Sequence, residues 1–282
     1  MALSKNTLAN CLASLLLLTI CCTRINVQKL PPVQNTGYFA PQNIKVDGKA
    51  DDWGDQFQAD NKHNHVEYTI ANNQTYLYLV LQTTDKATIN KIAQCGLSLV
   101  INTAKKQVSS ALTITFPHHP SGSDSRLLGY TKSDADNKRE RQLFFDSLMN
   151  LANYRIETTF KFIGITGTSL LADSSISVYN LDGIKAAARL DNKLVFTYEL
   201  AIPLKYLKNH FLSDKFSYDI KFNGVDTDHK LAFIHMENNP RGDMILFEVG
   251  NRFYRLGMTN DPDIMFSAYS TDFWGEYNIV SK

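Results

Sequence analysis

The stretch "NIKVDGKADDWGDQF", Asn43 to Phe57, combines four aspartates, two glycines and one of the two tryptophans of the chain. Calcium prefers about six to eight oxygen ligands, so Asp47, Asp51 and Asp52 are candidate calcium ligands. The spacing does not match an EF-hand loop, and aspartates beside glycine commonly hydrogen-bond their own backbone in turns. We therefore favour a turn that leads out of a first strand, with Trp53 covering the apolar core, and keep calcium as the alternative.

The composition indicates a globular protein without a nucleic-acid partner. The chain has 282 residues, of which 44% are hydrophobic and 20% are charged, enough for one large core or two small ones. The formal net charge is +1, and the charged residues are interspersed along the sequence. Because a phosphate-binding surface needs clustered Lys and Arg, nucleic acid is not expected as a partner.

The first residues, "MALSKNTLANCLASLLLLTICC", resemble a bacterial export signal. Lys5 precedes an apolar run that is too short to span a bilayer comfortably. Because the run ends in two cysteines, it is similar to a lipoprotein signal, in which the cysteine after the cleavage site carries the lipid. Cys22 is preferred because the preceding Cys21 is small, whereas cleavage before Cys21 would put the bulky Ile20 in that place. A plain secretory signal or a buried N-terminal helix is the alternative.

This interpretation predicts a signal at 1–22, a polar tether at 23–39 and a single domain at 40–282. The protein would be exported and lipid-anchored in the bacterial cell envelope, at the outer membrane or the cell surface, and would meet the membrane through its N-terminal lipid. Cys95 is the one cysteine in the body of the chain, so no intramolecular disulfide is expected there. We expect Cys95 to be a small buried residue at the start of a strand.

Short runs of Val, Ile, Tyr, Phe and Thr between Asn, Asp and Gly clusters predict β-strands. "HVEYTIANNQTYLYLVLQTTD" predicts a hairpin from His65–Ala71 and Thr75–Thr83, because asparagines favour the turn between them. "IKAAARLDNKLVFTYELAIP" predicts a second hairpin that turns at Asp191 and Asn192. Such strands without long βαβ alternation favour an all-β protein, an antiparallel β-sandwich.

The segment from Pro117 to Tyr154 departs from this pattern and predicts one helical insertion. A piece rich in Pro, Ser and Gly leads into a helix from about Asp134 to Leu151, with Ser133 as the expected N-cap. Four apolar side chains fall near one face of this helix, so we expect that face to lie on the sandwich: Leu143, Phe144, Leu148 and Leu151.

Three stretches together resemble the family 9 carbohydrate-binding modules and their DOMON-like relatives. They are "IKVDGKADDWG", "ANNQTYLYLVLQTTD" and "LVFTYELAIPLKYL", the last of which is similar to the family's E-x-A-I-P strand end at Glu199, Ala201, Ile202 and Pro203. The resemblance covers roughly residues 41 to 225. It implies a β-sandwich, usually non-enzymatic, that in some members binds sugars and calcium.

In sugar-binding members of that family two tryptophans sandwich the sugar ring, one of them shortly before the strand that here reads "CGLSLVIN". This chain has "TINKIAQCG" there, without tryptophan or acid. The late Trp274, in "YSTDFWGEYNIVSK", is the candidate ligand-binding residue, and Tyr and Phe side chains could supply other platforms.

The chain contains no G-x-S-x-G, P-loop or dinucleotide-binding motif. The expected function is therefore non-catalytic binding of a glycan or an envelope partner protein. One alternative is an envelope scaffold without sugar binding, which docks a partner through the insertion at about 117–154. The other is an enzyme whose carboxylates are brought together only by the fold. No cofactor is expected, with calcium as the possible exception.

Overall fold

The computed structural model describes residues 29–54, 56–103, 111–119, 127–128, 137–208, 214–225, 230–249 and 252–281. The chain divides into two compact units, Met1–Leu30 and Pro31–Lys282, and the second carries the fold. The predicted signal at 1–22, with Cys22, lies outside the described residues. In the parts of the chain that are described, no helix is long and apolar enough to cross a membrane.

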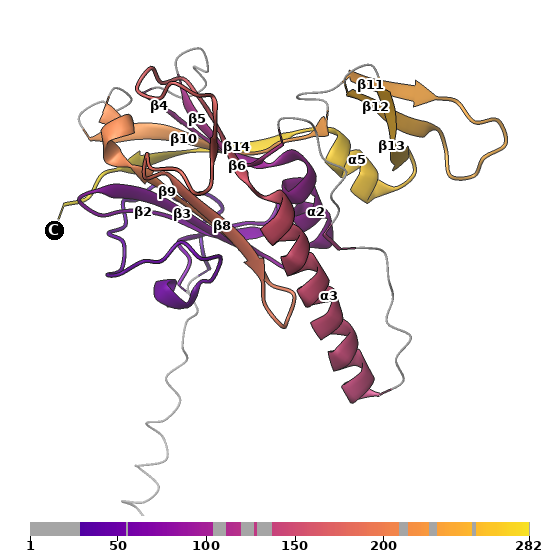
Figure 1. Cartoon of the computed structure of the whole chain (residues 1–282), viewed down its shortest axis with the longest axis horizontal. Coiled ribbons are helices and arrows are strands. Elements are labelled where there is room, and N and C mark those ends of the chain that lie inside the picture. The colour runs from indigo at the N-terminus through magenta and orange to yellow at the C-terminus, as the bar shows by residue number, and fades with distance from the viewer. Residues whose placement is uncertain are drawn as a thin grey trace, which may run out of the picture. The chain divides into compact units, whose positions relative to one another are not determined.

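Two antiparallel sheets formed by the described residues face each other (Figure 1). The five-stranded sheet has the order β1 (Ala59–Asn61), β2 (Val66–Asn72), β3 (Tyr76–Thr83), β9 (Phe196–Pro203) and β8 (Lys185–Leu190). The six-stranded sheet has the order β14 (Thr271–Asn278), β10 (Lys215–Phe222), β4 (Leu97–Asn102), β5 (Leu112–His118), β6 (Phe162–Thr166) and β7 (Ser175–Ser177). The predicted antiparallel β-sandwich with a helical insertion is confirmed.

The core lies between these sheets because successive side chains of a strand point to opposite faces. On β10 every second side chain is aromatic or aliphatic and fully buried: Phe216, Tyr218, Ile220 and Phe222. The hydroxyl oxygens of Tyr218 and Tyr68, from the opposite sheet, lie 2.9 Å apart, and Tyr218 also donates to the Gln34 carbonyl at 2.6 Å. The two sheets are thus joined by apolar packing and by a buried, satisfied hydroxyl pair.

Both predicted hairpins are present, and their turns use the expected chemistry. Between β2 and β3, Asn73 Oδ1 accepts the main-chain N–H groups of Thr75 and Tyr76, each at 2.8 Å. Between β8 and β9, Asp191 Oδ1 accepts the N–H groups of Lys193 and Val195, each at 2.8 Å. Short Asn and Asp side chains therefore fix where each pair of strands reverses.

The packed unit begins earlier than the sequence analysis placed it. Residues 31–39, assigned there to the tether, belong to the second compact unit. The main-chain N–H of Gln34 donates to the Tyr68 hydroxyl at 2.9 Å, and Gln34 Nε2 donates to the Ile70 carbonyl at 2.8 Å. The sandwich therefore holds chain that precedes Ala40.

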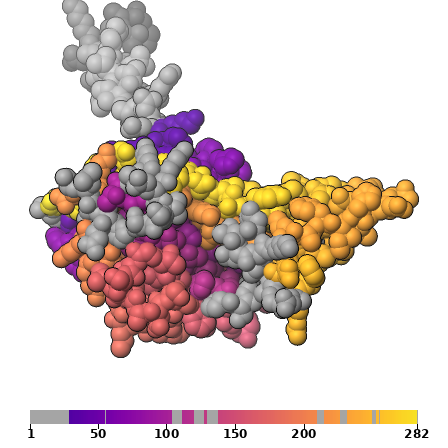
Figure 2. All heavy atoms as spheres, turned by 90° about the horizontal axis from the view of Figure 1, so that it is seen from above, coloured from indigo at the N-terminus to yellow at the C-terminus, as the bar shows by residue number. Residues whose placement is uncertain are grey.

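Helices and a small third sheet complete the described fold. The helical elements are η1 (Asp51–Trp53), α2 (Lys86–Cys95), α3 (Lys138–Thr159), η2 (Leu204–Tyr206) and α5 (Pro262–Ala268). The third sheet consists of β11 (Lys230–Ile234), β12 (Met244–Val249) and β13 (Arg252–Met258), and Figure 2 shows this region in orange and gold, extending from the side of the sandwich. It has its own small core with α5, which includes Ile245, Phe247, Leu256 and Ile264.

The helix of the insertion differs from the predicted helix at both ends. Ser133, the expected N-cap, lies outside the described residues. Helix α3 begins after Asn137, whose side chain accepts the N–H of Glu140 at 2.9 Å. It continues to Thr159, well beyond the predicted end at Leu151. The segment "YRIETT" at the end of α3 is helical because Ile156 continues the buried stripe of the helix, and this packing overrides the β propensity of Ile and Thr.

The predicted packing face of α3 is also wrong. Leu143 and Leu151 are 60% and 48% exposed, whereas the buried residues of α3 are Ala152, Asn153 and Ile156. Asn153 joins the helix to the sandwich, since it exchanges two hydrogen bonds of 2.9 Å with the main chain of Leu190 at the end of β8. The first half of α3 runs past β8 (Figure 1), so only its second half has a surface to pack against.

The prediction for Cys95 was wrong in two respects, because this residue ends helix α2 and does not start a strand, and it is only partly buried. Asp85 caps α2 by accepting the N–H of Thr88 at 2.8 Å. Asp261 likewise precedes Pro262 at the start of α5. Both helices are short, so the N-cap residues Asp85 and Asp261 are the main sequence features that indicate them.

The stretch from Asn43 to Phe57 folds over the outer face of the five-stranded sheet, where it meets Glu199 of β9. Glu199 Oε1 accepts the indole N–H of Trp53 at 2.9 Å, and Oε2 accepts the main-chain N–H groups of Asp47 and Gly48 at 2.9 and 2.8 Å. Glu199 and Trp53 are both buried. Two of the three stretches that resemble the carbohydrate-binding family thus meet at one buried carboxylate.

Gly48 is required at this corner for two reasons. Its φ of +79° is a conformation that L side chains rarely adopt, and a Cβ atom there would lie 2.8 Å from the main-chain carbon of Ala188 and from Arg189 Cβ. A side chain would therefore push the turn away from β8 and from the Glu199 carboxylate.

Replacing Trp53 by Ala should lower the free energy of unfolding by about 3 to 5 kcal/mol, because it removes a buried aromatic ring and one donor to Glu199. Chemical denaturation followed by circular dichroism measures this loss. A folded variant of unchanged stability would contradict the structural role of the corner.

A double-mutant cycle isolates the hydrogen bond from the packing. Trp53→Phe should cost about 1 to 3 kcal/mol, and Glu199→Leu, which removes every acceptor of that side chain, should cost at least as much. Together they should cost less than the sum, since both remove the same contact. Additive losses would show that the two residues do not interact.

Candidate functional site

The outer face of the six-stranded sheet carries polar side chains in place of the apolar ones on its inner face. On β10 these include Asp219 and Lys221, which alternate with the buried aromatic residues. The antiparallel pairing places Asp219 opposite Trp274 of β14, and Lys221 opposite Asp272. Cross-strand pairs of this kind have Cβ atoms about 4.5 to 5.5 Å apart. Four side chains with complementary chemistry therefore form one cluster.

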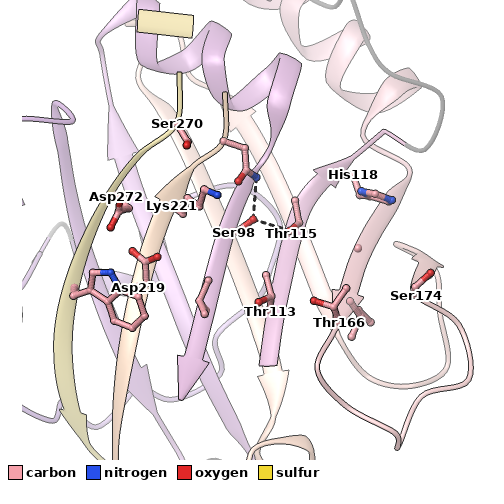
Figure 3. A pocket seen from close by; sticks show the side chains of 15 residues that line it. Ser98, Thr113, Thr115, His118, Thr166, Ser174, Asp219, Lys221, Ser270 and Asp272 are labelled. Atoms are coloured by element: carbon pink, nitrogen blue, oxygen red, sulfur yellow. Dashed lines mark hydrogen bonds between the residues drawn. The ribbon is translucent and has the colours of Figure 1, made fainter. Parts of the chain in front are cut away.

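This cluster lies at one end of a groove of about 730 Å³ that extends across β10, β4, β5 and β6. Figure 3 shows Asp219, Asp272 and Lys221 on one side of it, with hydroxyl side chains leading away toward Ser174. The other polar lining residues are Ser98, Thr113, Thr115, His118, Thr166, Asn223 and Ser270. The groove is thus aromatic and charged at one end and rich in neutral hydroxyl groups along its length.

The hydroxyl-rich part is held in place by its own hydrogen bonds, drawn as dashed lines in Figure 3. Ser98 Oγ and Thr115 Oγ1 lie 2.7 Å apart, and Asn223 Nδ2 donates to Ser98 Oγ at 2.9 Å. The Asn223 and Ser98 side chains are buried. Because these groups sit on adjacent strands and restrain one another, they present donors and acceptors at fixed positions.

Asp219 carries a buried oxygen atom that no described residue pairs with. Its side chain is 5% exposed, and its Oδ1 has no hydrogen-bond partner among the described residues. Burial, and then the negative charge of Asp272, raise the pKa of Asp219 to about 7, although Lys221 and the N–H of Phe273 act in the opposite direction. A buried polar atom without a partner is costly. Its oxygen is therefore available to a polar ligand.

A second buried polar atom on the same face of the sheet, Asn102 Nδ2, also lacks a hydrogen-bond partner among the described residues. Asn102, on β4, is 1% exposed, and its Nδ2 has no hydrogen-bond partner among the described residues. Asn102 pairs with Ser217 of β10, one step along the sheet from Asp219. Most buried polar groups of native proteins are paired. Among the described residues four buried side-chain atoms have no partner, and two of them, on Asp219 and Asn102, lie on this face; the other two are Ser175 Oγ and Tyr198 Oη.

Trp274, the ligand-binding residue expected from the sequence, does line the groove. Its indole lies beside Asp219 because Phe273, Gly275 and Tyr277 take the inward positions of β14. Gly275 is needed there, since a Cβ atom would lie 2.3 Å from the hydroxyl and ring atoms of Tyr218. The sequence analysis did not identify β14 as a strand, although this alternation was visible in "STDFWGEYN".

The aspartates proposed as calcium ligands serve turns on the opposite side of the sandwich. Asp47 Oδ1 accepts the N–H of Lys49 at 3.1 Å, and Asp52 Oδ2 accepts the N–H of Lys45 at 2.9 Å. Asp51 lies beside them in η1. In the described parts of the chain, no group of three or more His, Cys, Asp or Glu side chains could hold a metal ion. The hydrogen bonds agree with the turn interpretation of Asp47 and Asp52. The turn does not lead out of a strand, however, because the first strand of the described chain, β1, begins after it at Ala59.

Sequence reasoning missed the groove residues other than Trp274. In "KFSYDIKF", Asp219 and Lys221 occupy alternate positions of a strand whose remaining positions are aromatic or aliphatic. A carboxylate inside such a strand indicates a polar outer face, and this signal was available. The sequence did not show that Asp219 lies close to Trp274, because the pairing of β10 with β14 joins residues that are far apart in sequence.

The fold and the groove define an antiparallel β-sandwich protein with a polar cavity on one sheet. Comparison with family models found none that matches the chain, and comparison with curated proteins found no match. The resemblance to family 9 carbohydrate-binding modules therefore remains a prediction from the three sequence stretches.

The stability of the protein should depend on the ionisation of Asp219. Its pKa is raised from 3.8 to about 7 in the folded state, so the folded state binds this proton more tightly than the unfolded state does. The resulting stabilisation is full below about pH 4 and is lost as the pH rises through about 7. The Asp219→Asn variant stays neutral and should therefore gain stability relative to the wild type over this interval. Urea unfolding of both proteins between about pH 4 and pH 8 measures the difference, and a pH-independent difference would contradict the expectation.

Proposed function

We propose that the protein is a non-catalytic binding module that holds a glycan in the groove of the six-stranded sheet. The observation that carries the proposal is the buried, unpartnered Oδ1 of Asp219 directly across the strand pair from Trp274. The carboxylate supplies an acceptor for a hydroxyl group, and the indole supplies a flat apolar surface beside it.

The chemistry of a sugar ring fits these two features. A pyranose presents C–H groups on its faces, which pack on an aromatic ring, and hydroxyl groups around its edge, which need donors and acceptors. Thr113 and Thr166 continue the row of side chains that starts at Trp274 and Asp219. Typical ligand pockets have about 300 to 1,000 Å³, so a cavity of about 730 Å³ accommodates a short oligosaccharide.

The proposal includes the location that the first residues indicate. An exported protein that is lipid-anchored through Cys22 in the bacterial envelope would meet envelope or extracellular polysaccharides. The support for this part is the sequence of residues 1–22 alone.

Replacing Trp274 by Ala should weaken glycan binding at least about tenfold, because the stacking surface is lost while the sheet is kept. A glycan array followed by isothermal titration calorimetry measures the affinity. Phe253→Ala is the matched control, since Phe253 is an exposed aromatic residue on β13, outside the groove. Equal affinities of the wild type and the Trp274 variant for every bound glycan would place the site elsewhere. Recovery of the bound glycan uncleaved distinguishes a binding module from the enzyme alternative.

A second candidate function, a scaffold that docks a partner protein, is favoured by the exposed apolar side chains of α3. Leu143, Leu151 and Tyr154 are 60%, 48% and 64% exposed on this one helix. Clustered exposed apolar residues often mark interaction sites, and this helix belongs to the insertion for which the sequence analysis predicted docking.

A double substitution Leu143→Asp and Leu151→Asp should abolish a partner complex formed through α3, because it places two charges in an apolar contact. The fold should be retained, since both side chains are exposed. Affinity purification of the wild type and the variant from envelope extracts measures the loss. Glu157→Gln, which changes an exposed charged residue of α3, is the control. Unchanged co-purification would exclude docking through this surface.

A further inference from the structure

The groove has an acidic end, which we define as Asp219, Asp272 and Trp274. The binding of a neutral sugar does not require two carboxylates there. Asp219 faces Trp274 across the strand pair, and Asp272 precedes Trp274 by two residues on the same face of β14. Diagonal neighbours on a sheet lie about 7 to 8 Å apart, within reach of extended side chains. Two carboxylates therefore flank one indole ring.

From this arrangement we propose that the acidic end selects a glycan unit that carries a positively charged amino group. The inference rests on the proposed function, because it assigns a class of sugar to the same groove. It differs from that proposal in requiring charge recognition and not merely stacking and hydrogen bonding.

The balance of charges at the acidic end supports a cationic ligand. Asp219 and Asp272 carry two negative charges when ionised, and Lys221 supplies one positive charge, while Glu276 farther along β14 is engaged by Lys215 at 2.7 Å. His118 lines the groove on β5, on the far side of β4 from Asp219. Counting Asp219, Asp272 and Lys221, the end has one net negative charge when Asp219 is ionised, and one ammonium group neutralises it.

Electrostatic repulsion distinguishes an amine from a hydroxyl group here. Both can donate a hydrogen bond to Asp219 Oδ1, but only an ammonium group also offsets the repulsion between Asp219 and Asp272. The same group would lie against the indole of Trp274, whose ring face attracts cations. Hydrogen bonds between charged partners are about twice as strong as neutral ones, so the amine is the better occupant.

Apart from Lys221 and His118, the side chains that line the rest of the groove are uncharged. Ser98, Thr113, Thr115 and Thr166 offer hydroxyl groups to neighbouring sugar units. Only the sugar unit that lies against Trp274 is therefore recognised by its charge. A chain of partly deacetylated amino sugars, with one free amine at that unit, has this distribution of groups.

The test compares three oligosaccharides of equal length: fully deacetylated glucosamine oligomers, their N-acetylated counterparts and β-1,4-glucose oligomers. Isothermal titration calorimetry at a pH near 7, where about half of the Asp219 side chains are ionised before a cation binds, gives the affinities. We expect the deacetylated oligomer to bind about tenfold or more tightly than the other two, as a charged hydrogen bond requires. Asp272→Asn should remove most of this preference, because it removes one of the two carboxylates beside Trp274.

Two controls separate the site from general attraction between opposite charges. Glu157→Gln removes one negative charge on α3 and should leave the preference intact. Trp274→Ala should weaken the binding of all three oligomers. If Glu157→Gln reduces the preference as much as Asp272→Asn does, the recognition is non-specific and the inference is overturned.

A ligand with a permanent charge gives an independent readout. N-trimethylated glucosamine oligomers do not titrate, so their affinity should rise between about pH 6 and pH 8 as Asp219 ionises. In Asp219→Asn this rise should be absent. A pH-independent affinity in the wild type would contradict the role of Asp219.

The outcomes for the inference and for the proposed function are distinct. Equal affinity for the charged and neutral oligomers, with loss of binding in Trp274→Ala, overturns the inference and leaves the glycan-binding proposal standing. Absence of binding for these oligomers and for every glycan on an array contradicts both.

Discussion

The carboxylate of Glu199 is the contact on which the arrangement of the sandwich depends. It accepts N–H groups from Trp53, Asp47 and Gly48, and so ties the N-terminal part of the described chain to a strand of the five-stranded sheet. Burial raises the pKa of Glu199, and the three donors act in the opposite direction. The corner covers part of the outer face of the five-stranded sheet, and the groove with Asp219 lies on the outer face of the six-stranded sheet.

The two buried carboxylates of this fold, Glu199 and Asp219, have opposite consequences. Glu199 has a donor for each oxygen, so it stabilises a fixed turn. Asp219 is nearly as buried, yet its Oδ1 has no partner among the described residues, and Asp272 adds a like charge. Burial alone therefore does not distinguish an acid that holds a turn from the acid that we propose binds a ligand. The presence or absence of donors from the protein itself does.

Much of the sandwich was predictable because its signals are local. The turn residues Asn73 and Asp191 set both hairpins through hydrogen bonds to their own neighbours in sequence. The boundaries and the packing face of α3 were not predictable, because nothing in its sequence shows that β8 ends beside its second half. Leu143 and Leu151 look like core residues in a helical pattern, and only the position of the helix leaves them exposed.

The sequence by itself determined the class of fold, the two hairpins and the turn at Asp47 and Gly48, since alternation and turn chemistry act over a few residues. It also singled out Trp274, but not its surroundings. Only the tertiary structure placed Trp274 opposite Asp219 and aligned Lys221 with Asp272, through the pairing of β10 with β14. The physical reason is that the packing of inward side chains, such as Tyr218 against Gly275, sets the register of the sheet. That register also decides which outward side chains become neighbours, and the sequence around those side chains does not show it.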